Sequence, residues 1–126
     1  MMQILLDTNV FLWYFWGSNR IVPIRELLDH ENTDIFISAV SFWEITIKKR
    51  AGKLPVDIEK IRSFAKENMF SELPITSNYF KAYLELAQYH KDPFDHMLLA
   101  QAITSPMRFI TGDEHLAEYS SLVMVI

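Results

Sequence analysis

Short hydrophobic runs alternate along this chain with longer segments of helical periodicity. Five runs predict strands, at residues 3–6, 34–37, 70–75, 107–111 and 122–125. The third run carries Pro74, so we expect it at an edge of the sheet. The intervening segments predict helices over residues 10–16, 23–30, 39–51, 57–68, 76–90 and 92–105, with a short helix after Asp113.

Strands that alternate with helices predict a particular class of fold. Parallel neighbouring strands need crossover connections, and helices usually supply them. We therefore expect an α/β fold of three layers, α/β/α, in which helices cover both faces of a central, mainly parallel sheet of about five strands.

The helix over residues 92–105 carries a carboxylate on its hydrophobic side. Asp92 before Pro93 predicts the helix start, because the acid can cap free N–H groups and proline suits the first helical position. At helical spacing, Asp95 shares a face with Leu98, Leu99 and Ala102. Burying an unpaired carboxylate costs several kcal/mol, so either the helix N-terminus or a cation must satisfy Asp95.

A second acid, Glu44, lies on a hydrophobic face of the helix over residues 39–51. This face also contains Val40, Ile47 and Ala51. In the alternative interpretation, the Glu44 stem packs while its carboxylate reaches water or Lys48, one turn further on. When Glu44 is considered without the other acids, this alternative is the preferred interpretation.

The helix over residues 10–16 is apolar on every side. Thr8 and Asn9 are its candidate caps, and Gly17 predicts its end. Such a helix must be covered all round, either by the core of its own domain or by another chain. Burial in the core is the default, and a partner surface is the alternative.

Composition is that of an ordinary globular protein, with 50% hydrophobic and 22% charged residues. The length predicts a single domain, residues 1–126. The chain has no cysteine, which excludes a disulfide framework or a thiolate metal site. Neither a signal peptide nor an apolar run of the roughly 20 residues that span a bilayer is found, so we expect a soluble, cytoplasmic protein with no membrane partner.

The formal net charge of -4 argues against a protein that coats nucleic acid through a basic surface. The basic residues are nevertheless clustered. Seven of the twelve fall within residues 48–66, namely Lys48, Lys49, Arg50, Lys53, Lys60, Arg62 and Lys66. They form either a local positive surface or the solvated face of helices.

Four acids are expected at one edge of the predicted sheet. Asp7 ends the first strand and Asp113 follows the fourth, while Glu44 and Asp95 face inward from helices that begin at the same edge. Each has a separate explanation as a cap, turn or packed side chain. Two carboxylates 4 Å apart repel by about 4 kcal/mol at an effective dielectric of 20, so a joint cluster predicts a cation. Oxygen ligands favour Mg²⁺ or Mn²⁺.

The sequence also resembles the PIN-domain family, and within it the VapC toxins of toxin–antitoxin pairs. The resemblance lies in residues 5–12, 41–45 with Lys48, 90–95 with 99–102, and 111–113. It implies a PIN fold, a ribonuclease that depends on Mg²⁺ or Mn²⁺, a homodimer and inhibition by a cognate antitoxin. The family's acidic quartet matches Asp7, Glu44, Asp95 and Asp113. Asp92 matches an extra acid of this branch, and His96 departs from it, because the branch usually has arginine there.

For the RNA hydrolysis that the resemblance implies, the residue types predict a metal-activated water as the nucleophile, because no covalent nucleophile is indicated. We expect Asp7 and Asp95 to bind the ion, while Glu44 and Asp113 bind a second ion or orient water. Candidates for hydrogen bonds to these carboxylates are Thr8, Asn9, Ser41 and Thr111. His90 and His96 are poorly spaced to share a metal and are expected at the surface.

Two proteins of other functional classes share some of these sequence features. A phosphoacceptor receiver domain also carries acids at strand ends, but the adjacent acid pair and the late lysine of such domains are missing here. A non-catalytic PIN-like module that binds RNA or protein is the remaining alternative, and a metal titration separates it from an enzyme.

Overall fold

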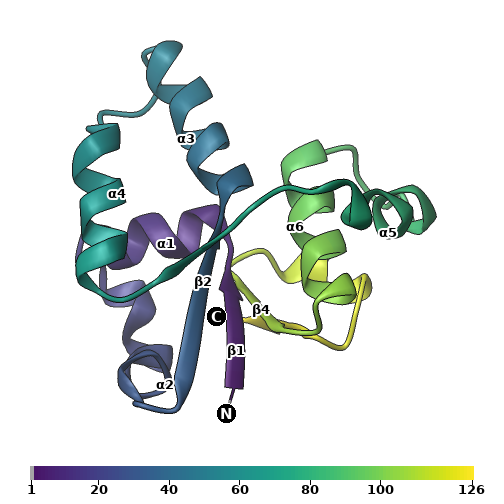
Figure 1. Cartoon of the computed structure of the whole chain (residues 1–126), viewed down its shortest axis with the longest axis horizontal. Helices are drawn as coiled ribbons and strands as arrows, with labels where there is room; N and C mark the ends of the chain where they lie inside the picture. The colour runs from purple at the N-terminus through teal and green to yellow at the C-terminus, as the bar shows by residue number, and fades with distance from the viewer. Residues whose placement is uncertain (1) are drawn as a thin grey trace.

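The computed structural model describes residues 2–126, in which a five-stranded sheet lies between helices (Figure 1). The strand order is β3-β2-β1-β4-β5, and every neighbouring pair is parallel. The strands are β1 (Met2–Leu6), β2 (Thr33–Ser38), β3 (Ser71–Leu73), β4 (Arg108–Thr111) and β5 (Val123–Val125). This confirms the predicted α/β class, and β3 lies at an edge as Pro74 indicated.

Helices cover both faces of the sheet. Figure 1 shows α1, α2 and α4 on one side and α5 and α6 on the other, while α3 continues from the carboxyl end of β2 and contacts α1, α4 and α6. The α-helices are α1 (Thr8–Phe15), α2 (Arg25–Asp29), α3 (Ala39–Arg50), α4 (Ile58–Glu67), α5 (Phe80–Glu85) and α6 (Pro93–Thr104). Short 3-10 helices are η1 (Asn19–Ile24), η2 (Ser77–Tyr79) and η3 (Glu114–Glu118). Within residues 2–126, no helix combines the length and the apolar character that crossing a membrane requires.

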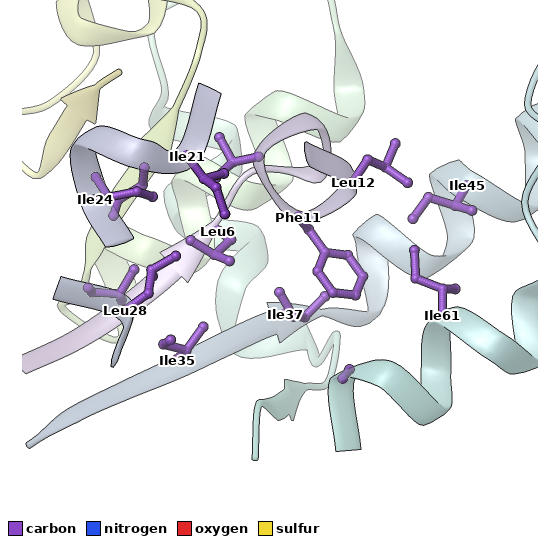
Figure 2. Packing of buried hydrophobic residues seen from close by; sticks show 14 of the residues in the cluster. Leu6, Phe11, Leu12, Ile21, Ile24, Leu28, Ile35, Ile37, Ile45 and Ile61 are labelled. Carbon is purple, nitrogen blue, oxygen red and sulfur yellow. The ribbon is translucent and has the colours of Figure 1, made fainter. Parts of the chain in front are cut away.

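The two faces of β1 pack into separate hydrophobic clusters. Ile4 and Leu6 join the cluster under α1, α2 and α4, part of which is seen in Figure 2, whereas Leu5 joins the cluster under α6. Successive strand residues point to opposite faces, so a strand covered on both sides is apolar throughout. This explains why the buried part of β1, residues 4–6, is an uninterrupted hydrophobic run.

Three predicted helix boundaries were wrong. The helix predicted over residues 76–90 is divided into η2 and α5 and ends at Glu85, because the chain then turns so that the loop at His90 can bond Tyr119. The segment over residues 23–30 is divided between η1, which contains Pro23, and α2. Helix α1 is capped by Asp7 rather than by Thr8 or Asn9, since Thr8 already lies in the helix.

The predicted hydrophobic face of α3 is buried only near its start. Val40 and Glu44 are buried, but Ile47 is 40% exposed and Ala51 is exposed, because the C-terminal half of α3 extends beyond the sheet. The buried positions of this helix are Val40, Ser41, Glu44 and Ile45.

The aromatic helix α1 is mostly covered by its own chain. Val10, Phe11 and Leu12 are buried and Trp13 is half-buried, while Trp16 is 50% exposed. Core packing therefore accounts for most of this helix, as the default interpretation expected. Among the aromatic residues from Phe11 to Trp16, only Trp16, which follows the last residue of α1, is exposed.

Helices α3 and α4 end in the same hydrogen-bonded turn, with a left-handed residue just beyond the helix. In α3 this residue is Gly52, with φ of 73°. In α4 it is Met69, with φ of 61°, a conformation that is unfavourable for a residue with a side chain.

Candidate functional site

Asp7 lies between β1 and β4, where the order in which the chain adds strands to the sheet reverses. Its backbone N–H donates to the carbonyl of Ile110 at 2.9 Å, and its side chain caps α1 by accepting from the Asn9 N–H at 2.9 Å. The hydroxyl of Thr111 donates to Oδ2 of Asp7. Only 6% of Asp7 is exposed. A strand end followed at once by a helix thus holds this carboxylate inside the protein.

Asp113 follows β4, the strand next to β1, and caps η3. Its Oδ1 accepts from the His115 N–H at 3.0 Å, and its own N–H donates to the Thr111 hydroxyl oxygen at 3.1 Å. Thr111 therefore links the carboxylate of Asp7 to the backbone of Asp113. Asp7 and Asp113 therefore both cap a helix, which is the structural role that the sequence offered as the alternative to metal binding.

Glu44 comes from α3, and 9% of it is exposed. Its Oε2 accepts from Lys48 Nζ at 2.7 Å, one helical turn further on. The stem of Glu44 packs in the interior and its carboxylate reaches Lys48, which is the arrangement described by the alternative interpretation. This ion pair places a positive charge beside the acids.

Asp95 lies in the first turn of α6, which Asp92 caps as predicted. Asp92 Oδ1 accepts from the N–H groups of Phe94 at 2.9 Å and Asp95 at 3.3 Å. The side chain of Asp95 is 21% exposed, and within residues 2–126 its carboxylate accepts no hydrogen bond. The helix N-terminus therefore binds Asp92 and leaves Asp95 unsatisfied.

Burial and the charges of neighbouring acids raise the pKa values of Asp95 and Asp7. Burial, followed by the charges of Asp7, Asp92, Glu44 and Asp113, raises the pKa of Asp95 to about 8. Burial likewise raises the pKa of Asp7, and the charges of Glu44 and Asp113 add to this, although the hydrogen bonds from Thr111 and Asn9 oppose it. A carboxylate that prefers its neutral form has too little positive charge around it.

The donor set fits Mg²⁺ or Mn²⁺ in its chemistry, because all the donors are carboxylate oxygens. Among residues 2–126, however, no three acidic or histidine side chains stand close enough together to enclose one ion. Mg²⁺ commonly keeps several waters and takes only one or two carboxylates from the protein. An ion of this kind therefore does not require a closed cage of side chains.

The hydrogen-bonding residues predicted around the acids have different roles. Thr111 bonds Asp7 through its side chain, whereas Asn9 does so only through its backbone N–H. Thr8 and Ser41 bond each other, Oγ1 to Oγ at 2.8 Å, and so join α1 to α3 instead of contacting an acid.

A second buried pair was not identified from the sequence. The Ser38 hydroxyl donates to Gln101 Oε1 at 2.6 Å, and Gln101 Nε2 donates to the Pro74 carbonyl at 3.2 Å. Gln101 is fully buried on α6 among hydrophobic residues, and a polar residue in that position is the signal that could have found it. This pair ties α6 to the carboxyl end of β2.

The prediction that His90 and His96 are surface residues was wrong for His96, whereas His90 is half-buried. His96 is buried, and the two imidazole rings stack with centroids 4.9 Å apart and planes 4° apart. Burial and the neighbouring His90 lower the pKa of His96. The rings meet because the loop after α5 folds back over the first turn of α6, which periodicity does not reveal.

Comparisons with known proteins agree with this architecture. The family model described as PIN domain matches residues 4–122. A structure of VapBC2 from Rickettsia felis bound to a promoter DNA fragment is similar with a TM-score of 0.74 at 16% identity, over 99% of this chain and 98% of that one. No curated protein sequence matches the chain.

Two further solved structures have the same fold. A toxin–antitoxin complex from Klebsiella pneumoniae gives a TM-score of 0.71 at 19% identity, over 97% of this chain and 96% of that one. FitAcB from Neisseria gonorrhoeae gives 0.66 at 20% identity, over 96% of both chains.

Proposed function

This chain belongs to the PIN-domain family, and from that premise we propose that it is an endoribonuclease that depends on Mg²⁺ or Mn²⁺ and hydrolyses RNA phosphodiester bonds. The observation that supports the proposal is that Asp7, Glu44, Asp95 and Asp113 come from four segments of the chain and that the charges of the other three act on Asp95. The raised pKa values of Asp7 and Asp95 support it, because they reflect a deficit of positive charge that a divalent cation corrects.

Asp7 and Asp95 are the proposed metal ligands, since they are the two acids whose charged forms are disfavoured without a cation. Glu44 and Asp113 complete the proposed catalytic and metal-binding set. A bound divalent ion supplies a more acidic water and neutralises charge on the phosphodiester. Thr111 and the Asn9 N–H orient Asp7, and Lys48 holds Glu44.

The chemistry of the residues favours water as the nucleophile. The chain has no cysteine. The hydroxyl groups nearest the acids are already engaged, because Thr8 bonds Ser41 and Thr111 bonds Asp7. A water molecule is therefore the group left to attack the phosphorus, and the acids orient it and accept its proton.

We also propose that the protein is the toxin of a toxin–antitoxin pair, with a cognate antitoxin as partner and a second copy as homodimer. The similar structure from Klebsiella pneumoniae is described as a toxin–antitoxin complex, and the one from Rickettsia felis as VapBC2 bound to a DNA fragment from the promoter. Large hydrophobic side chains at the surface support partner binding. They include Trp16, Trp43, Ile47, Phe80 and Leu84, which are 40–82% exposed.

A non-catalytic PIN-like binding module is the second candidate function. The ion pair between Lys48 and Glu44 favours it, because an acid that already has a cation partner has less need of a metal.

Metal titration and RNA cleavage, measured together, test the proposal. Protein freed of metal should bind Mn²⁺ in calorimetry and cleave a fluorescently labelled RNA only when Mg²⁺ or Mn²⁺ is added. EDTA and the Asp7→Asn variant should each abolish cleavage. Cleavage that persists in both would refute the metal site, and a protein that binds RNA but no metal would be the non-catalytic module.

A further inference from the structure

His90 lies in the loop between α5 and α6 and presents one ring nitrogen to the acidic site. Its Nε2 is shielded from solvent and has no hydrogen-bond partner among residues 2–126. The nearest acidic oxygen is Oδ2 of Asp95, at 3.8 Å, which is too long for a hydrogen bond. A buried nitrogen without a partner is costly, so its place beside Asp95 calls for an explanation.

The other ring nitrogen fixes the tautomer of His90. Its Nδ1 accepts a hydrogen bond from the Asp92 N–H at 3.2 Å. A neutral imidazole has one donor and one acceptor nitrogen. Because Nδ1 is the acceptor, the proton lies on Nε2, and the N–H group is directed at the side of the ring where Asp95 lies.

The position of the His90 ring is fixed from both sides. Its backbone N–H donates to the Tyr119 hydroxyl oxygen at 3.2 Å, and its ring stacks on that of His96. His96 Nε2 in turn lies 3.2 Å from the same Tyr119 hydroxyl. Tyr119 thus joins both histidines to the segment that follows η3, and the ring cannot swing away from the site without breaking these contacts.

We propose that His90 is a positioning residue for Asp95: its Nε2–H donates to Oδ2 of the Asp95 carboxylate and leaves Oδ1 to bind a divalent cation. In this arrangement the Nε2–Oδ2 distance is about 1 Å shorter than the 3.8 Å of the structure and so has the usual length of a hydrogen bond to a carboxylate. The role in metal binding rests on the proposed function, whereas the contact between His90 and Asp95 does not.

The competing explanation is that His90 only stabilises its own turn. His30, between α2 and β2, offers a comparison. Its Nδ1 accepts from the N–H of Asn32 at 3.1 Å, and this residue is also two positions further along the chain, as Asp92 is from His90. His30 is exposed and lies outside α3 and α6, the helices that carry Glu44 and Asp95. A substitution at His30 therefore reports the cost of losing such a turn alone.

Two substitutions at His90 separate the two roles of its ring. In His90→Asn the short amide can still accept from the Asp92 N–H, but no donor reaches Asp95. In His90→Gln the longer amide places an N–H near the position of Nε2, but the acceptor for the turn is lost. His30→Gln is the matched control.

Calorimetric titration of the metal-free proteins with Mn²⁺ should distinguish these variants by their affinity for the ion. His90→Asn should weaken Mn²⁺ binding about 10- to 100-fold, the usual effect of removing a hydrogen bond to a metal ligand. His90→Gln and His30→Gln should bind Mn²⁺ like the wild type. Loss of affinity in His90→Gln but not in His90→Asn would overturn the proposal, as would no loss in either, and thermal unfolding verifies that each variant folds.

A second measurement needs no metal. A long-range ¹H–¹⁵N spectrum of the histidine rings at pH 8, where imidazole is ordinarily neutral, should show the His90 proton on Nε2. Asp95→Asn should shift that Nε2 resonance and leave those of His30 unchanged. A proton on Nδ1, or a spectrum unaffected by Asp95→Asn, would overturn the contact. If the wild type binds no Mn²⁺, the proposed function fails, and this spectrum alone decides whether His90 positions Asp95.

Discussion

The hydroxyl of Thr111, at the end of β4, donates a hydrogen bond to Oδ2 of Asp7, at the end of β1. The two residues are 104 positions apart in the sequence and lie on adjacent strands, where Leu6 pairs with Ile110. The same hydroxyl oxygen accepts the N–H of Asp113. One threonine therefore sets the relative positions of two of the proposed site acids.

Replacing Thr111 by valine should weaken metal binding without changing the fold. Valine has nearly the same shape, but the Asp7 carboxylate loses its side-chain hydrogen bond, which favours its charged form. We expect the affinity for Mn²⁺ to fall about 10- to 100-fold, measured by calorimetry. Thr111→Ser keeps the hydroxyl and should bind like the wild type, so equal losses in both variants would contradict this assignment.

The two acids of the α6 N-terminus should respond differently to amide substitution. Asp92→Asn should change the free energy of unfolding by well under about 1 kcal/mol, because asparagine caps a helix about as well as aspartate. Asp95→Asn should leave the metal-free protein as stable or more stable, since it removes a repelled carboxylate, and should nearly abolish RNA cleavage. A destabilised but active Asp95→Asn protein would assign Asp95 to structure, and a stable but inactive Asp92→Asn protein would add Asp92 to the catalytic set.

Stability without metal should fall as the pH rises. The pKa of Asp95 is raised from 3.8 in the unfolded chain to about 8 in the folded one, so between these values the folded state binds more protons. This contribution is fully present near pH 4 and is lost as the pH approaches and passes 8. Urea unfolding in EDTA at pH 5 and pH 8 should show the decline, and Asp95→Asn should reduce it. A decline of equal size in the variant would remove Asp95 as its cause.

Met69→Gly should stabilise the protein. A left-handed conformation costs a residue with a side chain about 1–2 kcal/mol, and glycine gives back about 0.5–1 kcal/mol of this as backbone entropy. Met69 is 88% exposed, so few contacts are lost. We expect a net gain of about 0.5–1 kcal/mol in the free energy of unfolding. Gly52→Ala, at the equivalent position of α3, is the control and should destabilise.

Gly112→Ala should destabilise the loop that carries Asp113. A Cβ atom at this position collides with the ring of Trp13, which the guanidinium of Arg20 covers at 3.8 Å from the ring centroid. Overpacking of this kind costs about 1–3 kcal/mol. Urea unfolding should show the loss, together with a change in tryptophan fluorescence. An unchanged emission spectrum would mean that the loop, and not Trp13, moves.

Much of the fold could be predicted because its signals are local. Alternating strands and helices specified the parallel sheet, Pro74 marked the edge strand, and the Asp92-Pro93 pair marked the start of α6. The end of α5 could not be predicted, since the residues that follow it contain no glycine or proline. The chain leaves the helix there because the His90 loop bonds Tyr119, 29 residues further on.

The sequence by itself determined which acids to consider. Asp95 and Glu44 were found because a charge within a hydrophobic helical face is costly, and Asp7 and Asp113 because they follow strands. Only the tertiary structure decided what surrounds them, namely the ion pair of Glu44 with Lys48 and the stacking of His90 on His96 beside Asp95. Periodicity tells which way a residue faces along its own helix or strand. The atoms that meet it come from other segments of the chain, and only packing in three dimensions brings them together.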